Sequence, residues 1–341
     1  MKKTLLQLSV LLTMLVVSTS INAQDLYLII GQSNASGRDD NFDYNGADLK
    51  TNDVQLLSAR GRFWSAKQPL NRHSNIKKTN QVQGVNIGLE FGKQMHEFNG
   101  NKVYLVVNAR GGTKVAQWRN KGYRDAAIER VREAEDECNC QLKGILWHQG
   151  EGDTKSTGLG YTSSYISSLQ NLINEFRTEL NRDVPFIVGQ IAYKEKNVAF
   201  NEMIQTVTSN SFREDNVDWV SAEDLTTIDG THFSADSTRE LGRRYAYVMQ
   251  QYVGTSSKEL TEADSLNENT DSNSSISVSP NPTSEIIHIS GVSVNETFII
   301  YDMSGAIVME SEENDINVSE LNSGSYVIST SKGNKVKFLK N

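Results

Sequence analysis

A serine, a histidine and an aspartate stand at positions in this sequence from which they could together break an ester bond. Ser33 lies in GQSNASG (31–37), closely after the apolar run Leu26–Ile30. A serine at a strand-to-helix junction keeps a free backbone N–H, and this end of a helix carries partial positive charge. Alone, such a serine is more often a helix cap than a nucleophile, so the case depends on other residues.

A serine hydroxyl is a weak nucleophile until a base takes its proton. Of the five histidines, His232 is the candidate base, because it stands in DGTHFS (229–234) between the last apolar run and the last helical stretch. Asp229, across a glycine turn, can reach the imidazole, hold its tautomer and stabilise its charged form. An isolated Asp and His at this spacing are usually a plain turn, but together with Ser33 they predict nucleophilic catalysis.

The oxyanion that forms during acyl transfer needs hydrogen-bond donors. The backbone N–H of Ser33 is one candidate. Gly112 follows the apolar run Val103–Asn108 and allows close approach of backbone, and Gln149 follows the run Gly144–Trp147 and offers a side-chain amide. Either could be only a turn residue, but four separate segments would then supply a nucleophile, a base, an orienting carboxylate and three donors.

These motifs follow apolar runs that alternate with helix-period segments, which predicts a parallel sheet covered by helices on both faces. Ligands of such sheets bind at the carboxyl ends of the strands, where the motifs stand. The expected strands are Leu26–Ile30, Val103–Asn108, Gly144–Trp147, Phe186–Gln190 and Val217–Ala222, and the clearest helical periods lie in 163–181 and 236–253.

Four segments in order resemble the SGNH/GDSL hydrolase superfamily, and most closely its carbohydrate-esterase branch of sialate O-acetylesterase-like and acetyl xylan esterase-like proteins. They are GQSNASG, NARGGT (108–113), WHQGEGD (147–153) and DGTHFS, and the resemblance covers about 25–254. It implies a three-layer, flavodoxin-like α/β fold. It also implies that Ser33 is the nucleophile, His232 the base and Asp229 its orienting partner, with an oxyanion hole of Ser33, Gly112 and Gln149.

The sequence departs from the wider superfamily at two positions, both normal for this branch. Gln32 replaces the usual aspartate beside the serine, and Gln149 replaces the usual asparagine of the third motif. We expect Gln32, Asn34 and Glu151 to support the site, with Glu151 bracing the active-site loops or hydrogen-bonding the turn after Ser33. Trp118 is the candidate for a sugar-stacking residue at the rim, with plain packing as its alternative.

Composition excludes several other functions. The 341 residues carry a formal charge of −8, which argues against a nucleic-acid partner. All of this net charge lies in 255–341, which contain no arginine. The acidic run Asp39–Asp48 lacks the end residues of a calcium loop, so we expect a solvated loop. The sequence contains no HExxH, P-loop or GxGxxG motif, and the expected reaction requires no metal, so we expect no metal and no cofactor. For Cys138 and Cys140, free thiols and a local disulfide both remain open.

The two ends of the chain read as export signals. Residues 1–23 resemble a signal peptide, with two lysines before an apolar run too short for a comfortable membrane span. Residues 255–275 are polar and predict a linker, and 276–341 alternate short β-like runs with turns, which predicts a small β-sandwich.

Within this tail, SPNPTSE (279–285), YDMSGAIV (301–308), LNSGSYVI (321–328) and the lysine-rich finish resemble the C-terminal sorting domain of the type IX secretion system. A carbohydrate-binding or adhesion module is the alternative. The resemblance implies the secretion machinery as partner, export through the periplasm and across an outer membrane, and a secreted or cell-surface location without a membrane span in the mature chain.

The domains expected are therefore a signal peptide (1–23), an SGNH carbohydrate esterase domain (24–254), a linker (255–275) and a sorting domain (276–341). The predicted activity is that of a secreted serine esterase that removes O-acetyl groups from carbohydrate, such as acetylated xylan. The alternatives are a sialate O-acetylesterase and a non-catalytic glycan-binding surface protein on the same fold.

Overall fold

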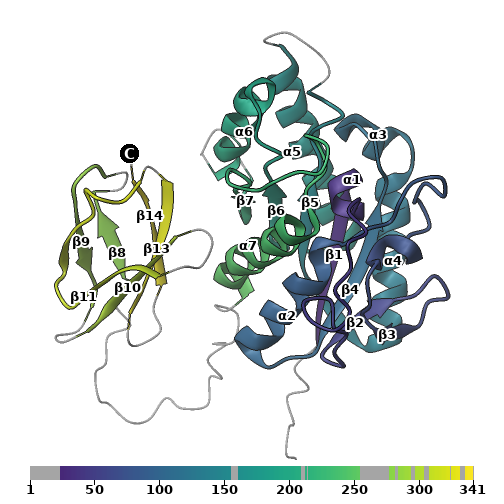
Figure 1. Ribbon diagram of the computed structural model, residues 1–341, viewed down its shortest axis with the longest axis horizontal. Coiled ribbons are helices and arrows are strands. Elements are labelled where there is room, and N and C mark those ends of the chain that lie inside the picture. The colour runs from purple at the N-terminus through teal and green to yellow at the C-terminus, as the bar shows by residue number, and fades with distance from the viewer. Residues whose placement is uncertain are drawn as a thin grey trace, which may run out of the picture.

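The computed structural model describes two folded parts of the chain (Figure 1). The described residues are 24–154, 160–208, 212, 214–253, 276–280, 283–292, 296–302, 307–322, 324–330 and 335–340. The expected signal peptide (1–23) and linker (255–275) lie outside them. None of the described helices is long and apolar enough to cross a membrane.

The larger part is built on a seven-stranded sheet of order β3-β2-β4-β1-β5-β6-β7. Its strands are β1 (Gln24–Gly31), β2 (Val54–Leu57), β3 (Phe63–Ser65), β4 (Val103–Ala109), β5 (Cys140–His148), β6 (Phe186–Gly189) and β7 (Val217–Val220). Every neighbouring pair is parallel except β2 and β3. The five predicted strands are confirmed, whereas the sequence analysis missed the short antiparallel pair at the edge.

Helices cover both faces of this sheet (Figure 1). They are α1 (Ser33–Ser36), α2 (Ile87–Asn99), α3 (Val115–Asn120), α4 (Tyr123–Cys138), α5 (Gly160–Leu180), α6 (Val198–Gln205) and α7 (Ala235–Val253), with 3-10 turns η1 (Leu70–His73), η2 (Glu195–Asn197) and η3 (Thr206–Thr208). Successive side chains of a strand point to opposite faces. Leu26, Leu28 and Ile30 of β1 therefore pack with α3, α4 and α5, and Tyr27 and Ile29 with α2 and α7. The predicted three-layer α/β architecture is confirmed.

The turn from β1 into α1 depends on a glycine. Gly31 has φ +134°, and a Cβ at this position would lie 2.0 Å from the backbone oxygen of His148 at the end of β5. Only glycine allows this approach. The next residue, Gln32, donates its backbone N–H to the same oxygen at 2.9 Å. The start of α1 is thereby held beside the loop that follows β5.

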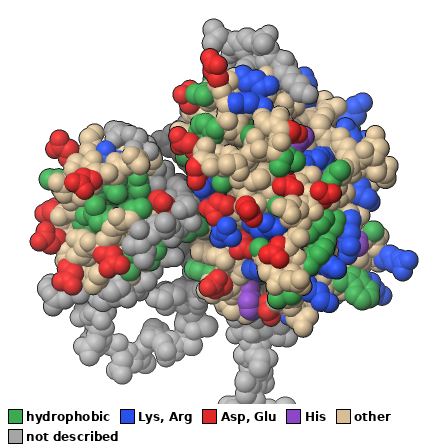
Figure 2. All heavy atoms as spheres, in the orientation of Figure 1, with side chains coloured by type: hydrophobic (Ala, Val, Ile, Leu, Met, Phe, Trp, Pro, Cys, Tyr) green, Lys and Arg blue, Asp and Glu red, His purple; other side chains and the backbone are tan. Residues whose placement is uncertain are grey.

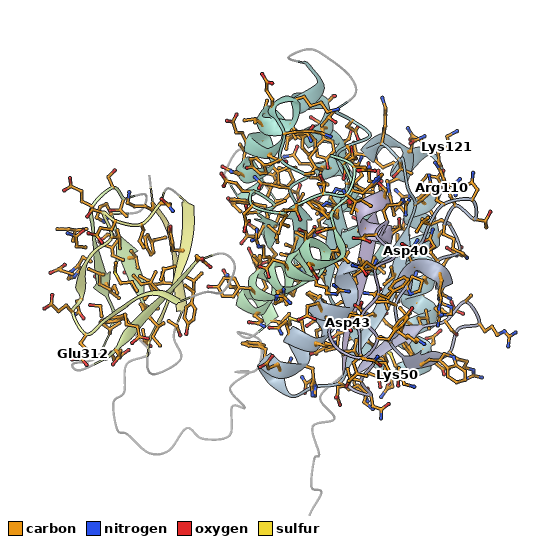
Figure 3. The ribbon with its side chains drawn as sticks, in the orientation of Figure 1. Asp40, Asp43, Lys50, Arg110, Lys121 and Glu312 are labelled. Carbon is orange, nitrogen blue, oxygen red and sulfur yellow. A yellow bond between two sulfur atoms is a disulfide. The ribbon has the colours of Figure 1, made fainter. Side chains whose placement is uncertain are left out.

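The acidic loop after α1 is mostly exposed, as expected, and its exposed residues Asp40 and Asp43 are labelled in Figure 3. Its two end carboxylates have structural partners instead. Asp48 is buried and pairs with Arg239 of α7 at 2.5 Å. Asp39 Oδ2 accepts the backbone N–H of Ala235, the first residue of α7, at 2.7 Å. This loop therefore anchors α7 to the sheet edge.

The two cysteines, for which the sequence left two states open, are joined as a Cys138–Cys140 disulfide between α4 and β5.

The smaller part consists of two antiparallel sheets, of orders β11-β10-β13-β14 and β12-β9-β8. The strands are β8 (Ser277–Ser279), β9 (Ile286–Ser290), β10 (Phe298–Asp302), β11 (Ile307–Ser311), β12 (Asp315–Asn317), β13 (Gly324–Thr330) and β14 (Lys335–Lys340). Ile287, Ile300 and Ile328 lie in the shared apolar core. The predicted small β-sandwich is confirmed. Most of the charged side chains on the face of this part seen in Figure 2 are acidic.

Candidate active site

Three of the predicted side chains form a continuous hydrogen-bonded row. Ser33 Oγ, at the start of α1, lies 3.1 Å from Nε2 of His232. Nδ1 of the same ring lies 2.6 Å from Oδ2 of Asp229. His232 and Asp229 come from one loop, which leads into α7. The topology therefore brings together groups separated by about two hundred residues of sequence.

The loop holds Asp229 in its charged form. The backbone N–H groups of Thr231 and His232 donate to Asp229 Oδ1 at 2.9 and 2.8 Å. Partial burial raises the pKa of this carboxyl, but the hydrogen bonds from His232 and Thr231 outweigh that effect and lower the pKa. An ionised Asp229 fixes the proton of the neutral imidazole on Nδ1, which leaves Nε2 able to accept a proton.

The row opens into a cavity of about 540 Å³, whose lining includes Ser33, His232, Asp229, Gln32 and Gly112. Gly112 has φ +72°, which suits glycine. Within the described part of the chain, the backbone N–H groups of Ser33 and Gly112 have no hydrogen-bond acceptor. Both can donate to an oxygen that enters the cavity.

The amide of Gln149 is turned away from this cavity, contrary to its expected role as an oxyanion donor. Gln149 is fully buried and does not line the cavity. Its Nε2 donates to the backbone oxygen of Thr113 at 2.8 Å and to Gln32 Oε1 at 3.1 Å, and Asp153 Oδ2 lies 2.7 Å away. These acceptors exhaust the two hydrogens of the amide.

Gln32 instead presents an amide to the cavity. Its Oε1 accepts from Gln149 Nε2 and, at 3.0 Å, from the backbone N–H of Gly152. With the oxygen fixed inward, Gln32 Nε2 lies 3.4 Å from Ser33 Oγ. Gln32 Nε2 thus lies beside the nucleophile, whereas the Gln149 amide contacts Gln32 Oε1 behind it.

Asn34 links the serine turn to the histidine loop. Its Nδ2 donates to Glu151 Oε1 and, at 3.0 Å, to the backbone oxygen of Thr231. Its Oδ1 accepts the backbone N–H of Phe233 at 3.1 Å. Burial raises the pKa of Glu151 to about 7. Glu151 thus contacts the turn after Ser33, which was one of the two contacts expected for it.

Comparison with known proteins fits this geometry. Residues 23–251, more than half of the chain, match the family described as carbohydrate esterase, sialic acid-specific acetylesterase. The chain belongs to this carbohydrate-esterase family. Residues 277–341 match the secretion system C-terminal sorting domain, which indicates export of this esterase across the outer membrane. The resemblances stated for both parts of the sequence are thereby confirmed.

Individual relatives agree. The esterase is 28% identical over 192 residues to the probable carbohydrate esterase At4g34215 of Arabidopsis thaliana, covering 52% of this chain and 72% of the relative. The crystal structure of the protein from that Arabidopsis locus superposes with a TM-score of 0.58 at 25% identity, over 68% of this chain and 98% of that one. NanS superposes at a TM-score of 0.55 and 14% identity, over 69% and 99% of the two chains, and shows the shared fold.

Trp118 does not lie at the rim of the esterase site, so that expectation is wrong. Its side chain is fully buried, with Nε1 donating to Thr113 Oγ1 at 3.2 Å and the ring packed edge-on against Trp147 at 5.2 Å between centroids. α3 turns it inward together with Val115, which is also buried. The three-residue spacing of these two apolar side chains was the sequence signal for a buried helix face.

Four basic side chains that the sequence analysis did not single out line the cavity of the esterase: Arg38, Lys114, Lys194 and Lys196. Lys194 Nζ donates to the backbone oxygen of Gly230 and to Thr231 Oγ1, and so holds the loop that carries His232. Burial lowers the pKa of Arg38 and of Lys194. Arg38 and Lys114 directly follow two of the recognised motifs, which was a sequence signal for their position. Lys194 and Lys196 follow none of the motifs, so no such signal pointed to them.

The histidine of the third motif, His148, packs in the core and does not line the cavity. His148 is fully buried, with Nδ1 3.2 Å from the hydroxyl of Tyr245, and burial lowers its pKa to about 3. It is therefore neutral at ordinary pH. In the described residues, no cluster of three or more His, Cys, Asp or Glu side chains could hold a metal ion.

Proposed function

We propose that this carbohydrate esterase removes O-acetyl groups from polysaccharide, with Ser33 as nucleophile, His232 as general base and Asp229 as the carboxylate that orients it. The observation that carries the proposal is the row Ser33–His232–Asp229, with contacts of 3.1 and 2.6 Å at the wall of a cavity. Nucleophilic hydrolases need this order of groups.

The first half of the reaction acylates Ser33. Its Oγ attacks the carbonyl carbon of the acetyl ester as its proton passes to His232 Nε2. The oxyanion of the tetrahedral intermediate accepts from the backbone N–H groups of Ser33 and Gly112 and from Gln32 Nε2. The carbon–oxygen bond to the sugar then breaks, and His232 gives its proton to the departing sugar oxygen.

The second half regenerates the enzyme. A water molecule loses a proton to His232 Nε2 and attacks the carbonyl carbon of acetyl-Ser33. The same three donors stabilise the second oxyanion. Its collapse releases acetate, and the proton returns from His232 to Ser33 Oγ. No external reactant other than water is needed.

Acetylated xylan is the first polymer to test, as the sequence predicted. A sialate O-acetylesterase is the second candidate, because four cationic side chains line the cavity and a sialic acid carries a carboxylate. The family description, sialic acid-specific acetylesterase, also favours it.

The test compares the full chain with its Ser33→Ala variant. We expect the wild type to hydrolyse 4-nitrophenyl acetate and to release acetate from acetylated xylan or from O-acetyl sialic acid. The variant should lose roughly 10⁴-fold or more, because no other group supplies the nucleophile. The better of the two natural substrates identifies the sugar class.

A fluorophosphonate probe separates catalysis from binding. It should label wild-type Ser33 and leave the variant unlabelled. A folded wild type that remains unlabelled, and hydrolyses these substrates no faster than Ser33→Ala, would make non-catalytic glycan binding the better assignment.

A further inference from the structure

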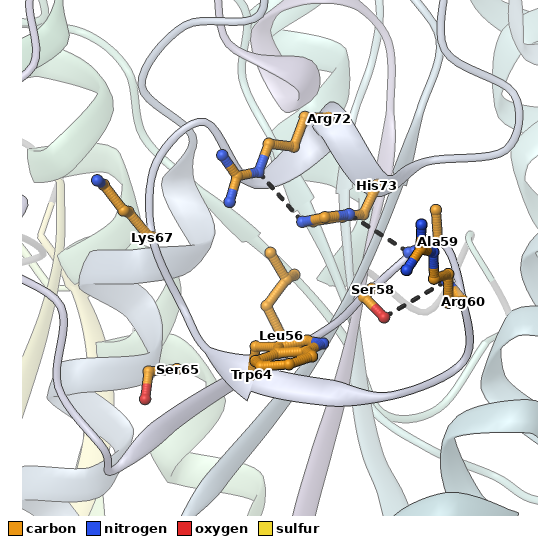
Figure 4. A pocket seen from close by; sticks show the side chains of 9 residues that line it. All are labelled: Leu56, Ser58, Ala59, Arg60, Trp64, Ser65, Lys67, Arg72 and His73. Carbon is orange, nitrogen blue, oxygen red and sulfur yellow. Dashed lines mark hydrogen bonds between the residues drawn. The ribbon is translucent and has the colours of Figure 1, made fainter.

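A second cavity lies at the edge of the sheet, apart from the row of reacting groups. It has a volume of about 370 Å³ and is walled by β2, β3, η1 and the loop between the two strands. Figure 4 shows the indole of Trp64 on one side, with Arg72 and His73 of η1 opposite and Lys67 and Arg60 at the two ends. Pockets of this size take small ligands such as one or two sugar rings.

Trp64 is unusual because it is a large aromatic side chain left open to solvent. Its exposed fraction, 67%, is the highest among the exposed large hydrophobic side chains of the described residues. It pairs with Leu56 across the antiparallel strands β2 and β3, and Leu56 is buried. Residues paired across antiparallel strands share one face of the sheet, so both side chains line the cavity: Leu56 is buried at its wall, whereas the Trp64 ring stays open to solvent. An exposed aromatic ring of this kind is a typical platform for the apolar face of a sugar.

The charged side chains that line this cavity are all basic: Arg60, Lys67 and Arg72. No Asp or Glu lines the cavity. Within the described residues, Arg60, Lys67 and Arg72 have no carboxylate partner; Lys67 Nζ lies instead over the ring of Tyr44, and Arg72 Nε donates to His73.

Elsewhere in the larger part, arginines are paired. Apart from Arg110, the described arginines outside the two cavities all contact an Asp or Glu. Burial lowers the pKa of His73, and the charges of Arg72, Arg130 and Lys77 lower it further. The region around the Trp64 ring is therefore suited to an anion.

This cavity and the candidate active site both lie at the end of the sheet where the parallel strands have their carboxyl termini. It opens beyond the carboxyl end of β2, which runs parallel to β4. In η1, Asn71 Oδ1 accepts the backbone N–H of Ala109 at 2.9 Å, and Asn71 Nδ2 donates to the oxygen of the same residue at 3.2 Å. Ala109 ends β4 just before the segment that carries Gly112. A chain held in the second cavity would thus lie beside the loop that lines the first.

We propose that this cavity is an accessory binding site for an acidic saccharide chain, in which Trp64 stacks on a sugar ring and Arg60, Lys67 and Arg72 bind uronic acid carboxylates. The site goes beyond the proposed reaction and does not require it. A saccharide is favoured over a nucleic acid because the cations gather around one cavity instead of forming a basic stripe, and the whole chain carries a charge of −8.

The experiment measures binding by the full chain carrying Ser33→Ala, so that no polymer is hydrolysed. Calorimetry is run with polygalacturonate and with glucuronoxylan, each beside its carboxyl-reduced form. We expect at least one uronate polymer to bind, and its reduced form to bind at least about tenfold more weakly. Added Trp64→Ala should lower affinity at least about tenfold, and Trp64→Phe should retain most of it. Arg72→Gln should lower it about three- to tenfold and reduce its salt dependence.

Controls separate this site from the catalytic one. Lys102→Gln removes an exposed lysine just before β4, at the opposite edge of the sheet, and should leave affinity unchanged. A chain that retains Ser33 and carries only Trp64→Ala should hydrolyse 4-nitrophenyl acetate at the wild-type rate, which establishes that the variant folds.

Three outcomes overturn the proposal: no uronate polymer binds, Trp64→Ala binds as tightly as its parent, or the reduced polymers bind as well as the acidic ones. Single-stranded DNA that binds more tightly than the polymers, and equally depends on Trp64, would assign the site to nucleic acid.

Discussion

The described residues include two histidine–aspartate pairs with the same short contact, in surroundings that differ completely. At the candidate active site, His232 Nδ1 lies 2.6 Å from Asp229. In the tail, His288 Nδ1 of β9 lies 2.6 Å from Asp315 of β12, across an antiparallel ladder. The first pair is completed by Ser33 on its far side and lines a cavity. The second has a serine, Ser279, as a cross-strand neighbour, yet makes no hydrogen bond to a serine within the described residues.

The difference shows what the pair needs to become catalytic. Half of the His288 side chain is exposed to solvent, against a quarter of that of His232. Water can solvate the tail pair from several sides, so its hydrogen bond is a surface contact of small energy. Beside Ser33, the same contact orients a ring whose other nitrogen meets a nucleophile. The third group and the cavity, more than the pair, carry the functional information.

Removing each histidine gives the largest expected contrast. His232→Ala should lower kcat for 4-nitrophenyl acetate by roughly 10⁴- to 10⁶-fold, because the base is lost. His288→Ala should leave kcat within about twofold of wild type, since its ring meets no reacting group. Steady-state kinetics on the full chain measure both. Equal losses in the two variants would remove the basis of the comparison.

Replacing the two aspartates tests the same contrast, with a smaller expected loss of kcat. Asp229→Asn should lower kcat by roughly 10²- to 10⁴-fold, because the amide favours the wrong histidine tautomer. The loss should fall below that for His232→Ala, since half of the Asp229 side chain is exposed and water can partly replace it. Asp315→Asn is the matched control and should leave kcat unchanged. An Asp229→Asn enzyme with wild-type kcat would mean that the carboxylate does not orient the base.

The third prediction concerns the proposed oxyanion donor Gln32 and its neighbour Gln149, which have no counterpart beside the histidine–aspartate pair of the tail. Gln32→Ala should lower kcat by roughly 10²- to 10³-fold with little change in KM, the effect of losing one oxyanion donor. Gln149→Ala should act in the same direction but less strongly, because it only positions the Gln32 amide. Kinetics of the two variants decide the assignment: a larger loss for Gln149→Ala than for Gln32→Ala would restore the role first expected for Gln149.

The smallest expected effect concerns the free energy of unfolding. Burial raises the pKa of Glu151 from its ordinary 4.5 to about 7. The neutral carboxyl therefore contributes stability that is complete below about pH 4.5 and is lost as pH rises through about 7. Glu151→Gln cannot ionise, so the wild type should lose about 3 kcal/mol relative to this variant between pH 4.5 and 8.

Urea unfolding of both proteins at pH 5 and pH 8 measures this difference, and Glu285→Gln in the tail provides a carboxylate control. If the stability difference between wild type and Glu151→Gln is the same at both pH values, Glu151 is not held in a neutral, buried state.

The sequence was sufficient for those features that depend on chain order and strand ends. The residues Ser33, Gly112 and His232 each follow a buried strand, and parallel strands bring their carboxyl ends to one edge, so their convergence could be predicted. The strands β2 and β3 could not be predicted, because they are short and β3, at the edge of the sheet, has no buried residue to give it an apolar period.

Side-chain direction was the part that sequence could not determine. Whether Gln32 or Gln149 faces the cavity depends on acceptors and donors from other loops, namely the backbone oxygen of Thr113 and the backbone N–H of Gly152. Trp118 was misplaced for a related reason: its position after a motif suggested the rim, whereas helix α3 turned its ring into the core.

One feature of the loop before α7 has a mechanical consequence. Two hydrogen bonds join Asp229 to His232 within a single turn, and a third joins it to the backbone N–H of Thr231. The loop is attached to the rest of the site through Asn34 and Lys194. A displacement that preserves the turn moves base and carboxylate as one rigid unit. The length of their mutual contact then stays constant, and only the gap to Ser33 changes. The approach of the base to its nucleophile thus depends on one distance, that between the loop before α7 and the turn after β1.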